Sequence, residues 1–220
     1  MTKIEKIKKP KIFIFLNDPE CSVICCAGMY EALSENYDIQ IFTKHDLSVK
    51  LLKKADIIAF PGGIGNSGSF ENLLEDKVDI VKEYLAKGGR YLGICMGAYW
   101  VGHYYFDILD GIKVVQYIKR RNTEIKRSYA TIAEVIWKGN SESMYFYDGC
   151  AFICKPHKQK TIATYANGDP MAIIQNRIGL IGCHPESSLS WYRQPYLESH
   201  WHEFRHHQLL LNFVNELMER

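Results

Sequence analysis

Short apolar runs alternate with segments of helical periodicity through the first half of this chain, and that alternation limits its fold more than any other feature. The runs at 11–16, 38–42, 56–60 and 90–94 have the length of buried strands. Patterns typical of amphipathic helices lie between them. Parallel strands need a crossover connection, so the sequence predicts a mainly parallel sheet with helices on both sides.

Three helices are expected from residue spacing and from their ends. The first has Asp18 as its N-cap and Pro19 as its first residue, and a later one closes at the glycine pair 88–89. Their predicted buried faces, including that of a C-terminal helix, are Val23, Cys26, Ala27 and Tyr30; Leu74, Val78, Val81 and Leu85; and Leu210, Phe213, Val214 and Leu217. The segment 61–70 carries four glycines and is expected to form no regular structure.

The second half changes character to short β-like runs separated by turn residues. These runs are 112–118, 131–137, 144–147, 151–154, 161–165, 171–175 and 178–182. They predict hairpins that extend the sheet. No internal repeat or long linker divides the chain, so we expect residues 1–220 to form a single α/β domain, a three-layer sandwich around the sheet.

Composition places the chain among globular proteins and excludes several other classes. Hydrophobic residues make up 47% and charged residues 24%, and the net charge of +2 gives no whole-protein field for nucleic acid. The Lys-rich start lacks the apolar stretch of a secretory signal, and no run is long enough to span a membrane. We therefore expect a soluble cytoplasmic protein whose seven cysteines are reduced, with no nucleic-acid or membrane partner.

Cys95 lies in a Gly-x-Cys-x-Gly frame between a predicted buried strand and a predicted helix. This is the layout of a nucleophile elbow, in which small neighbours allow a sharp turn that holds the nucleophile above the strand's carboxyl end. The helix N-terminus would favour the thiolate. The structural alternative is a small buried cysteine whose glycines serve close packing.

Two further motifs end predicted strands. His184 and Glu186 follow the run 178–182 at a spacing that lets the carboxylate orient the imidazole, as a base and its orienter require. The Pro-Gly-Gly turn at 61–63 follows the run 56–60, where the Gly63 N–H, with that of Met96, could face a developing oxyanion. Each motif alone has an ordinary explanation as a turn. Together they lie where open α/β sheets place their ligand sites.

These motifs, in this order, resemble the signature of the class I glutamine amidotransferase superfamily, whose fold is flavodoxin-like. Within it, the sequence is similar to the N-terminal domain of certain biotin-protein ligases. The likeness there rests on Gly93–Tyr99 and on the turn Tyr147-Asp148-Gly149. The resemblance implies Cys95 as nucleophile, His184 as general base and acid, Glu186 as orienter, and Gly63 and Met96 as oxyanion donors. It further implies Gly62, Tyr99, Tyr147 and Gly149 as substrate-binding residues.

The expected function is cysteine-dependent hydrolysis or transfer of a small-molecule amide or acyl substrate, with no cofactor and no metal. Tyr99 stands four residues after Cys95, where glutaminases of this superfamily usually carry Gln. We expect no synthetase domain on the same chain, so released ammonia would need a separate synthetase or ligase partner. A regulatory or non-catalytic binding module of the biotin-ligase type is the alternative, with glutamine not the substrate; a peptidase-like or deglycase-like relative is a third.

Residues outside these motifs have simpler explanations. His202 and His206 stand at i and i+4, a spacing that suits a metal, but a polar helix start beneath Trp201 and Phe204 accounts for them. Four other thiols are expected to serve packing alone: Cys21, Cys25, Cys26 and Cys154.

Overall fold

A nine-stranded sheet forms the centre of the protein in the computed structural model, which describes residues 8–64, 67–154 and 158–220. Five neighbouring strands run parallel in the order β2-β1-β3-β4-β11. They are β1 (Lys11–Phe15), β2 (Asp38–Phe42), β3 (Ile57–Phe60), β4 (Arg90–Ile94) and β11 (Ile178–Ile181). The predicted parallel sheet is therefore confirmed, and the carboxyl ends of these strands share one edge.

Antiparallel strands continue the sheet beyond β11 in the order β10-β9-β6-β7. They are β10 (Pro170–Gln175), β9 (Lys160–Tyr165), β6 (Thr131–Trp137) and β7 (Asn140–Phe146). The predicted extension of the sheet by antiparallel hairpins is confirmed, except that β5 (Ile112–Gln116) and β8 (Cys150–Cys154) pair with each other in a separate two-stranded sheet. Since β9 is already paired with β10 on one side and β6 on the other, it offers β8 no free edge.

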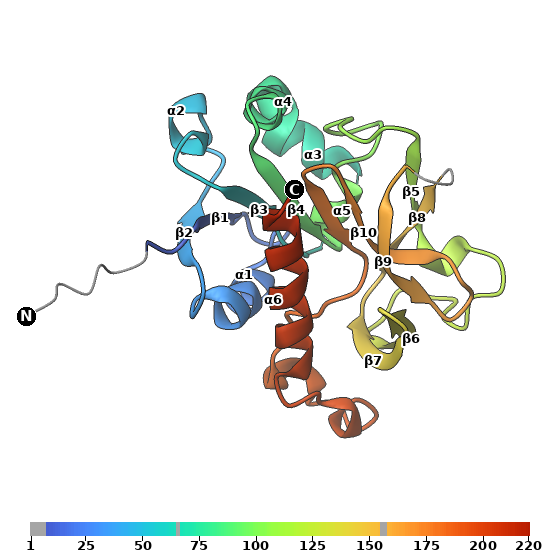
Figure 1. Ribbon diagram of the computed structural model, residues 1–220. Coiled ribbons are helices and arrows are strands. Elements are labelled where there is room, and N and C mark those ends of the chain that lie inside the picture. Colours follow the sequence, from blue (N-terminus) through green and yellow to red (C-terminus); the bar gives the residue numbers. More distant parts are fainter. Residues whose placement is uncertain (1–7, 65–66, 155–157) are drawn as a thin grey trace, which may run out of the picture.

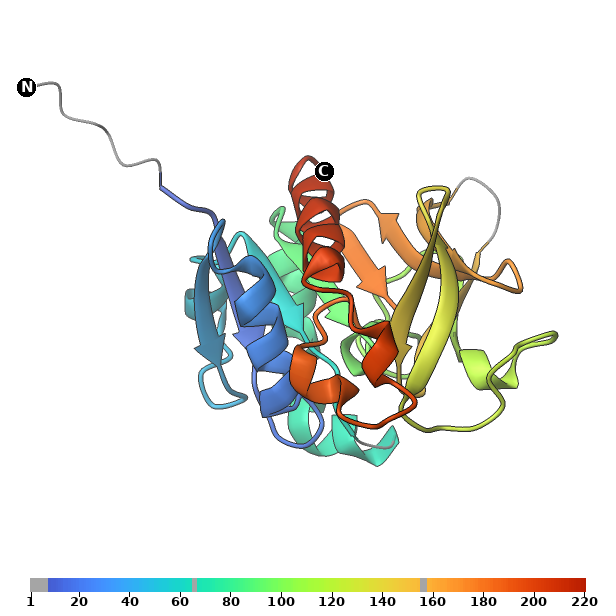
Figure 2. The same ribbon diagram turned by 90° about the horizontal axis from the view of Figure 1, so that it is seen from below.

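Helices cover both faces of the sheet (Figures 1 and 2). Helices α1 (Val23–Leu33) and α6 (Arg205–Met218) lie side by side on one face, and α2 (Val49–Leu52), α3 (Ser67–Leu74) and α4 (Val78–Ala86) lie on the other. Side chains of β1 alternate between the two layers: Ile12 and Ile14 pack in the core with α1 and α6, and Phe13 in the core with α2 to α4. The architecture is the expected three-layer α/β sandwich.

Helix α1 begins later than the sequence predicted. Its N-cap is Ser22, whose hydroxyl accepts the Cys25 N–H at 3.2 Å, whereas Asp18 and Pro19 belong to a preceding turn closed by a bridge between Asn17 and Cys21. The shifted start changes the buried face. Of the four residues expected inside, only Cys26 is buried; the buried set is Cys25, Cys26, Gly28, Met29 and Leu33.

The segment after β3 also differs from the prediction. Helix α3 begins at Ser67, inside the stretch expected to be irregular, and the short 3-10 helix Glu75–Lys77 separates α3 from α4. Leu74 and Val81 are fully buried as predicted, while Val78 and Leu85 are half-buried. The predicted face of α6 is confirmed, since all four of its residues are buried. No helix within the described ranges is long and apolar enough to cross a bilayer.

Candidate functional site

Cys95 occupies a strained turn between β4 and the short helix α5 (Met96–Tyr99). Its φ of 49° and ψ of −105° are rare for a residue with a side chain. The Cys95 N–H donates to the Ile181 carbonyl at 2.9 Å, which fixes the turn to the end of β11. The Cys95 thiol points to the Tyr147 carbonyl at 3.6 Å. This is the geometry expected of a nucleophile elbow.

The two glycines of the motif make this turn sterically possible. A Cβ on Gly97 would lie 1.8 Å from the Phe60 carbonyl oxygen, and one on Gly93 would lie 2.6 Å from the Gly97 carbonyl oxygen. Contacts this short do not occur between real Cβ atoms and backbone. The two glycines are therefore needed for close packing of the turn against β3 as well as for the position of Cys95.

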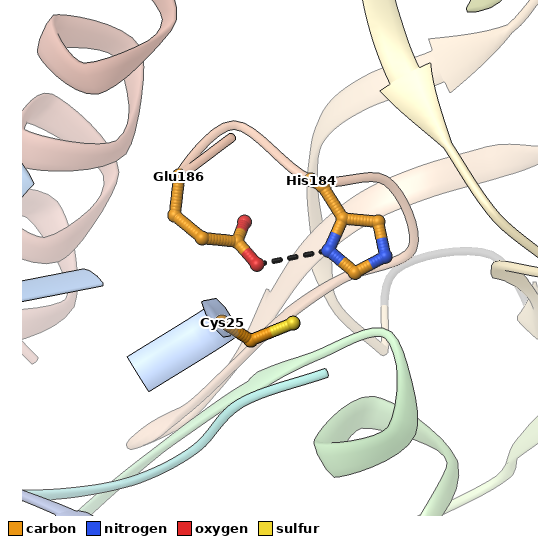
Figure 3. Close-up of side chains that lie close together, drawn as sticks. All are labelled: Cys25, His184 and Glu186. Carbon is orange, nitrogen blue, oxygen red and sulfur yellow. Dashed lines mark hydrogen bonds and ion pairs between the residues drawn. The ribbon is translucent and has the colours of Figure 1, made fainter. Parts of the chain in front are cut away.

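His184 and Glu186 form a buried hydrogen-bonded pair just beyond β11. The His184 Nδ1 and a Glu186 carboxylate oxygen are 2.8 Å apart, and the two residues are 3% and 0% exposed (Figure 3). The backbone of this segment is anchored on both sides: the His184 N–H donates to the Tyr145 carbonyl at 2.9 Å, and a Cβ on Gly28 of α1 would lie 2.3 Å from the Glu186 carbonyl oxygen.

Charge and hydrogen bonding favour the protonated imidazole at His184. Burial by itself lowers the pKa of His184, but the charge of Glu186, the charge of Cys95 and hydrogen bonds with the Cys25 and Cys95 thiols outweigh it. The net result is a His184 pKa well above the ordinary value. The imidazole is thus placed to accept a proton and to hold it.

The Pro-Gly-Gly turn lies between these groups, at the carboxyl end of β3. A Cβ on Gly62 would lie 2.5 Å from His184 Cε1 and 3.3 Å from Cys95 Cβ, so glycine is required where the base and the elbow approach. The Gly62 carbonyl accepts the Ser22 N–H at 2.9 Å. Because a trans peptide is planar, the Gly63 N–H points the opposite way from that carbonyl.

A cavity of about 850 Å³ opens beside the elbow. Its walls include five of the residues singled out from the sequence: Gly63, Cys95, Met96, Tyr99 and Tyr147. The Met96 N–H, in the first turn of α5, has no partner within the helix. Both predicted oxyanion donors and the predicted nucleophile therefore border the same space.

The two expected substrate-binding glycines, Gly62 and Gly149, lie outside the cavity wall. Gly62 separates His184 from Cys95, and a Cβ on Gly149 would lie 2.1 Å from the Gly182 carbonyl oxygen, where the turn after β7 packs on the end of β11. Tyr99 does reach the cavity, and its hydroxyl donates to the Asp148 carbonyl at 3.1 Å. The substrate roles of these residues stay predictions.

Comparisons with known proteins agree with this architecture. Residues 17–122 match the family described as biotin-protein ligase, N terminal. The imidazole glycerol phosphate synthase subunit HisH of Hydrogenovibrio crunogenus is 27% identical over 155 residues, which cover 62% of this chain and 72% of that protein. The family match and this relative support a class I glutamine amidotransferase-like superfamily for the chain.

Solved structures share the fold across almost the whole chain. A glutamine amidotransferase from Thermotoga maritima superposes with a TM-score of 0.70 at 13% identity, covering 96% of this chain and 99% of that one. The PurLQS structure from the same organism gives a TM-score of 0.64 at 13% identity, with 95% and 99% covered. These likenesses concern the fold.

Cys25 is the site residue that sequence reasoning missed. It was expected to serve packing alone, yet its sulfur lies beside His184 and 3.2 Å from the position that a Cβ on Gly62 would take (Figure 3). The start of α1 could have indicated this role. A helix that follows β1 begins at the same sheet edge as the motifs, and Cys25 is in its first turn. Misplacing the helix start concealed this.

Other thiols are held in the protonated form. Burial raises the pKa of Cys26 and that of Cys183 to about 12, and raises those of Cys21 and Cys150 well above the ordinary value. The Cys26 thiol donates to the Phe15 carbonyl at 3.3 Å within the core. These four groups therefore suit packing, as expected for Cys21 and Cys26, and Cys154 has no described side chain.

Two buried histidines bind the segment that follows Glu186, and a third binds β7. His202 and His207 each place Nε2 at 3.1 Å from the Ser187 carbonyl oxygen, and His206 places Nε2 at 3.2 Å from the Glu142 carboxylate. Helix α6 begins at Arg205, so His202 precedes it and the predicted one-helix spacing of His202 and His206 is absent. These hydrogen bonds connect residues 202–207 to Ser187, which directly follows Glu186, and to Glu142.

Proposed function

We propose that this chain is an amidotransferase-like hydrolase that acts on a small-molecule amide or related acyl compound. One observation carries the proposal: Cys95 sits on a strained turn at the end of β4, and a buried His184–Glu186 pair ends the adjacent strand β11. Nucleophilic catalysis by a thiol requires this set of nucleophile, base and orienter.

The proposed reaction has two stages. His184 takes the Cys95 thiol proton as the sulfur attacks the carbonyl carbon, the Gly63 and Met96 N–H groups stabilise the oxyanion, and the protonated imidazole gives its proton to the leaving amine. Water, deprotonated by His184, then attacks the thioester. The acid leaves and the Cys95 thiol is restored. Glu186 holds His184 in orientation throughout.

The cavity supports a substrate larger than a carboxamide side chain. Aromatic residues line much of it beside Cys95, including Tyr99, Tyr105 and Tyr147. Burial raises the pKa of Tyr99 well above its ordinary value, so its hydroxyl stays a neutral donor. We expect bulky, partly apolar carboxamides to be preferred over glutamine.

A separate synthetase or ligase partner is part of the proposal for a transfer reaction. A relative is named as a subunit of a synthase, and a fold neighbour was solved within PurLQS. Those names support two separate chains, of which this one would release ammonia and the partner would use it.

Hydrolysis of a carboxamide panel, followed by ammonia release, tests the proposal. We expect Cys95→Ala to lower kcat by at least about 10³-fold, because removing a nucleophile abolishes the covalent route. Cys26→Ala serves as the matched control, since it removes a core thiol that does not line the cavity. A folded Cys95→Ala protein with full hydrolysis would contradict the assignment.

A non-catalytic binding module is the second candidate, and the Cys95 thiol favours it by pointing to the Tyr147 carbonyl at 3.6 Å. Iodoacetamide labelling discriminates the two. A catalytic Cys95 reacts stoichiometrically and fast, whereas a thiol that only donates to a carbonyl labels at the rate of an ordinary cysteine.

A further inference from the structure

Cys25 brings a third ligand type to the His184–Glu186 pair. The Cys25 sulfur, a nitrogen of His184 and a carboxylate oxygen of Glu186 all lie within 4.8 Å of one another, and all three residues are buried. The sulfur points toward the space between the Glu186 carboxylate and the imidazole ring (Figure 3). They come from separate elements, α1 and the segment after β11, that converge at this point.

Glu186 supplies an independent sign that a ligand belongs here. One carboxylate oxygen binds His184, but the other, Oε2, is buried without any hydrogen-bond partner in the described part of the chain. An unsatisfied carboxylate oxygen in a residue that is 0% exposed is costly, because burial removes the water that would otherwise bind it. A bound cation removes that cost.

The donor set selects the kind of ion. A thiolate and an imidazole are soft or borderline ligands that favour Zn²⁺ over Mg²⁺ or Ca²⁺. Ligand atoms around one Zn²⁺ lie about 3–4 Å apart, given bonds of about 2.0–2.3 Å in tetrahedral geometry. The separations here, within 4.8 Å, require only small side-chain shifts to close on an ion.

We propose that Cys25, His184 and Glu186 form a Zn²⁺ site that overlaps the candidate catalytic pair. The metal takes Cys25 as the thiolate, His184 through Nδ1 and Glu186 through its carboxylate. The thiol proton and the Nδ1 proton leave as the ion binds, so two negative ligands offset its charge. No metal was expected from the sequence, because Cys25 was assigned to packing.

Binding at this site would separate His184 from its orienter. The imidazole would face the metal through the nitrogen that now binds Glu186, so it would no longer be held to accept the Cys95 proton. Zn²⁺ would then inhibit hydrolysis reversibly, and a chelator would restore it. This consequence rests on the proposed function, whereas binding of the ion does not.

Metal binding by the chelator-treated full chain tests the site directly. Calorimetry with Zn²⁺ should give one ion per chain, and Co²⁺ should produce the near-ultraviolet absorption band of a thiolate–cobalt bond. Cys25→Ser should weaken Zn²⁺ affinity by more than about 100-fold and abolish the band, since even outer partners of a metal contribute about 10–100-fold. Cys25→Ala provides a second variant, and thermal melting checks that each is folded.

Two matched variants locate the site. Cys26→Ser changes the neighbouring thiol on α1, which faces Phe15, and should retain the wild-type affinity. Cys95→Ser, inactive under the proposed function, should also retain it. Equal affinity in wild type and Cys25→Ser would overturn the proposal, as would loss of binding only in Cys95→Ser. Failure of catalysis with intact binding would refute the proposed function alone.

Discussion

At the scale of single residues, the site depends on a few positions where backbone and side chain leave no alternative. Cys95 is held at positive φ by a hydrogen bond to β11 and by the close approach of Gly97 to β3. Such strain persists only where the surrounding structure enforces it. The strain therefore indicates that the two strands, rather than the local sequence, orient the thiol.

The pKa of His184 should fall when its carboxylate partner is neutralised. Glu186 is the largest influence that raises the His184 pKa against the effect of burial, so Glu186→Gln should lower it. NMR titration of the His184 ring proton measures this shift. Glu142→Gln is the control, because it neutralises the carboxylate that pairs with His206 instead of the one that pairs with His184. An unchanged His184 pKa in Glu186→Gln would contradict the electrostatic account.

Site residues could be predicted where their role depends on neighbours in the sequence. The glycines flanking Cys95 and the pair His184–Glu186 could be interpreted from spacing, because close approach and hydrogen bonding depend on neighbours in sequence. Cys25 could not, because its role depends on α1 meeting the segment after β11. The Glu186 carboxylate oxygen that lacks a partner likewise becomes buried only in the folded chain.

At the scale of elements, α6 and the residues before it support the segment that carries the base. Two of their histidines are buried and neutral: burial lowers the pKa of His202 to about 4 and that of His206 to about 3. The apolar face of α6 was predictable from its period, whereas the break between α3 and α4 has no glycine or proline to signal it.

Acid should weaken the fold through these histidines. In the unfolded chain they gain protons near pH 6.5, whereas in the folded chain they stay neutral until about pH 4 and 3. The unfolded state thus binds more protons, and stability is lost as pH falls below about 6.5. Between pH 7 and 5 we expect a loss on the order of 1–3 kcal/mol.

Urea denaturation of wild type and of the double variant His202→Asn/His206→Gln isolates this effect. His184 acts in the opposite direction, because its raised pKa makes the folded state the better proton acceptor, but it is present in both proteins and cancels in the comparison. The unfolding free energy of the variant should depend less on pH between 7 and 5. Parallel pH profiles would show that the buried histidines do not govern acid stability.

At the scale of the whole molecule, the chain completes its sheet out of sequence order. Strand β11 lies between β4 and β10, so the parallel half built from the first hundred residues gains its fifth strand from the far end of the chain. Local patterns predicted the strands but not this pairing, because it joins segments nearly ninety residues apart. The same pairing brings His184 beside Cys95.

A fragment ending at residue 122, where the family match ends, should therefore fail to fold. It would keep β1 to β4 but lose β11 and α6. Leu92 and Ile94, both 0% exposed in the full chain, would then be exposed to solvent. An apolar central strand turned into an open edge favours aggregation over folding. The full chain should lose near-ultraviolet circular dichroism in one cooperative urea transition, consistent with a single domain, while fragment 8–122 should show none. A sharp transition in the fragment would mean that the second half is a separable unit, and that the site joins two domains.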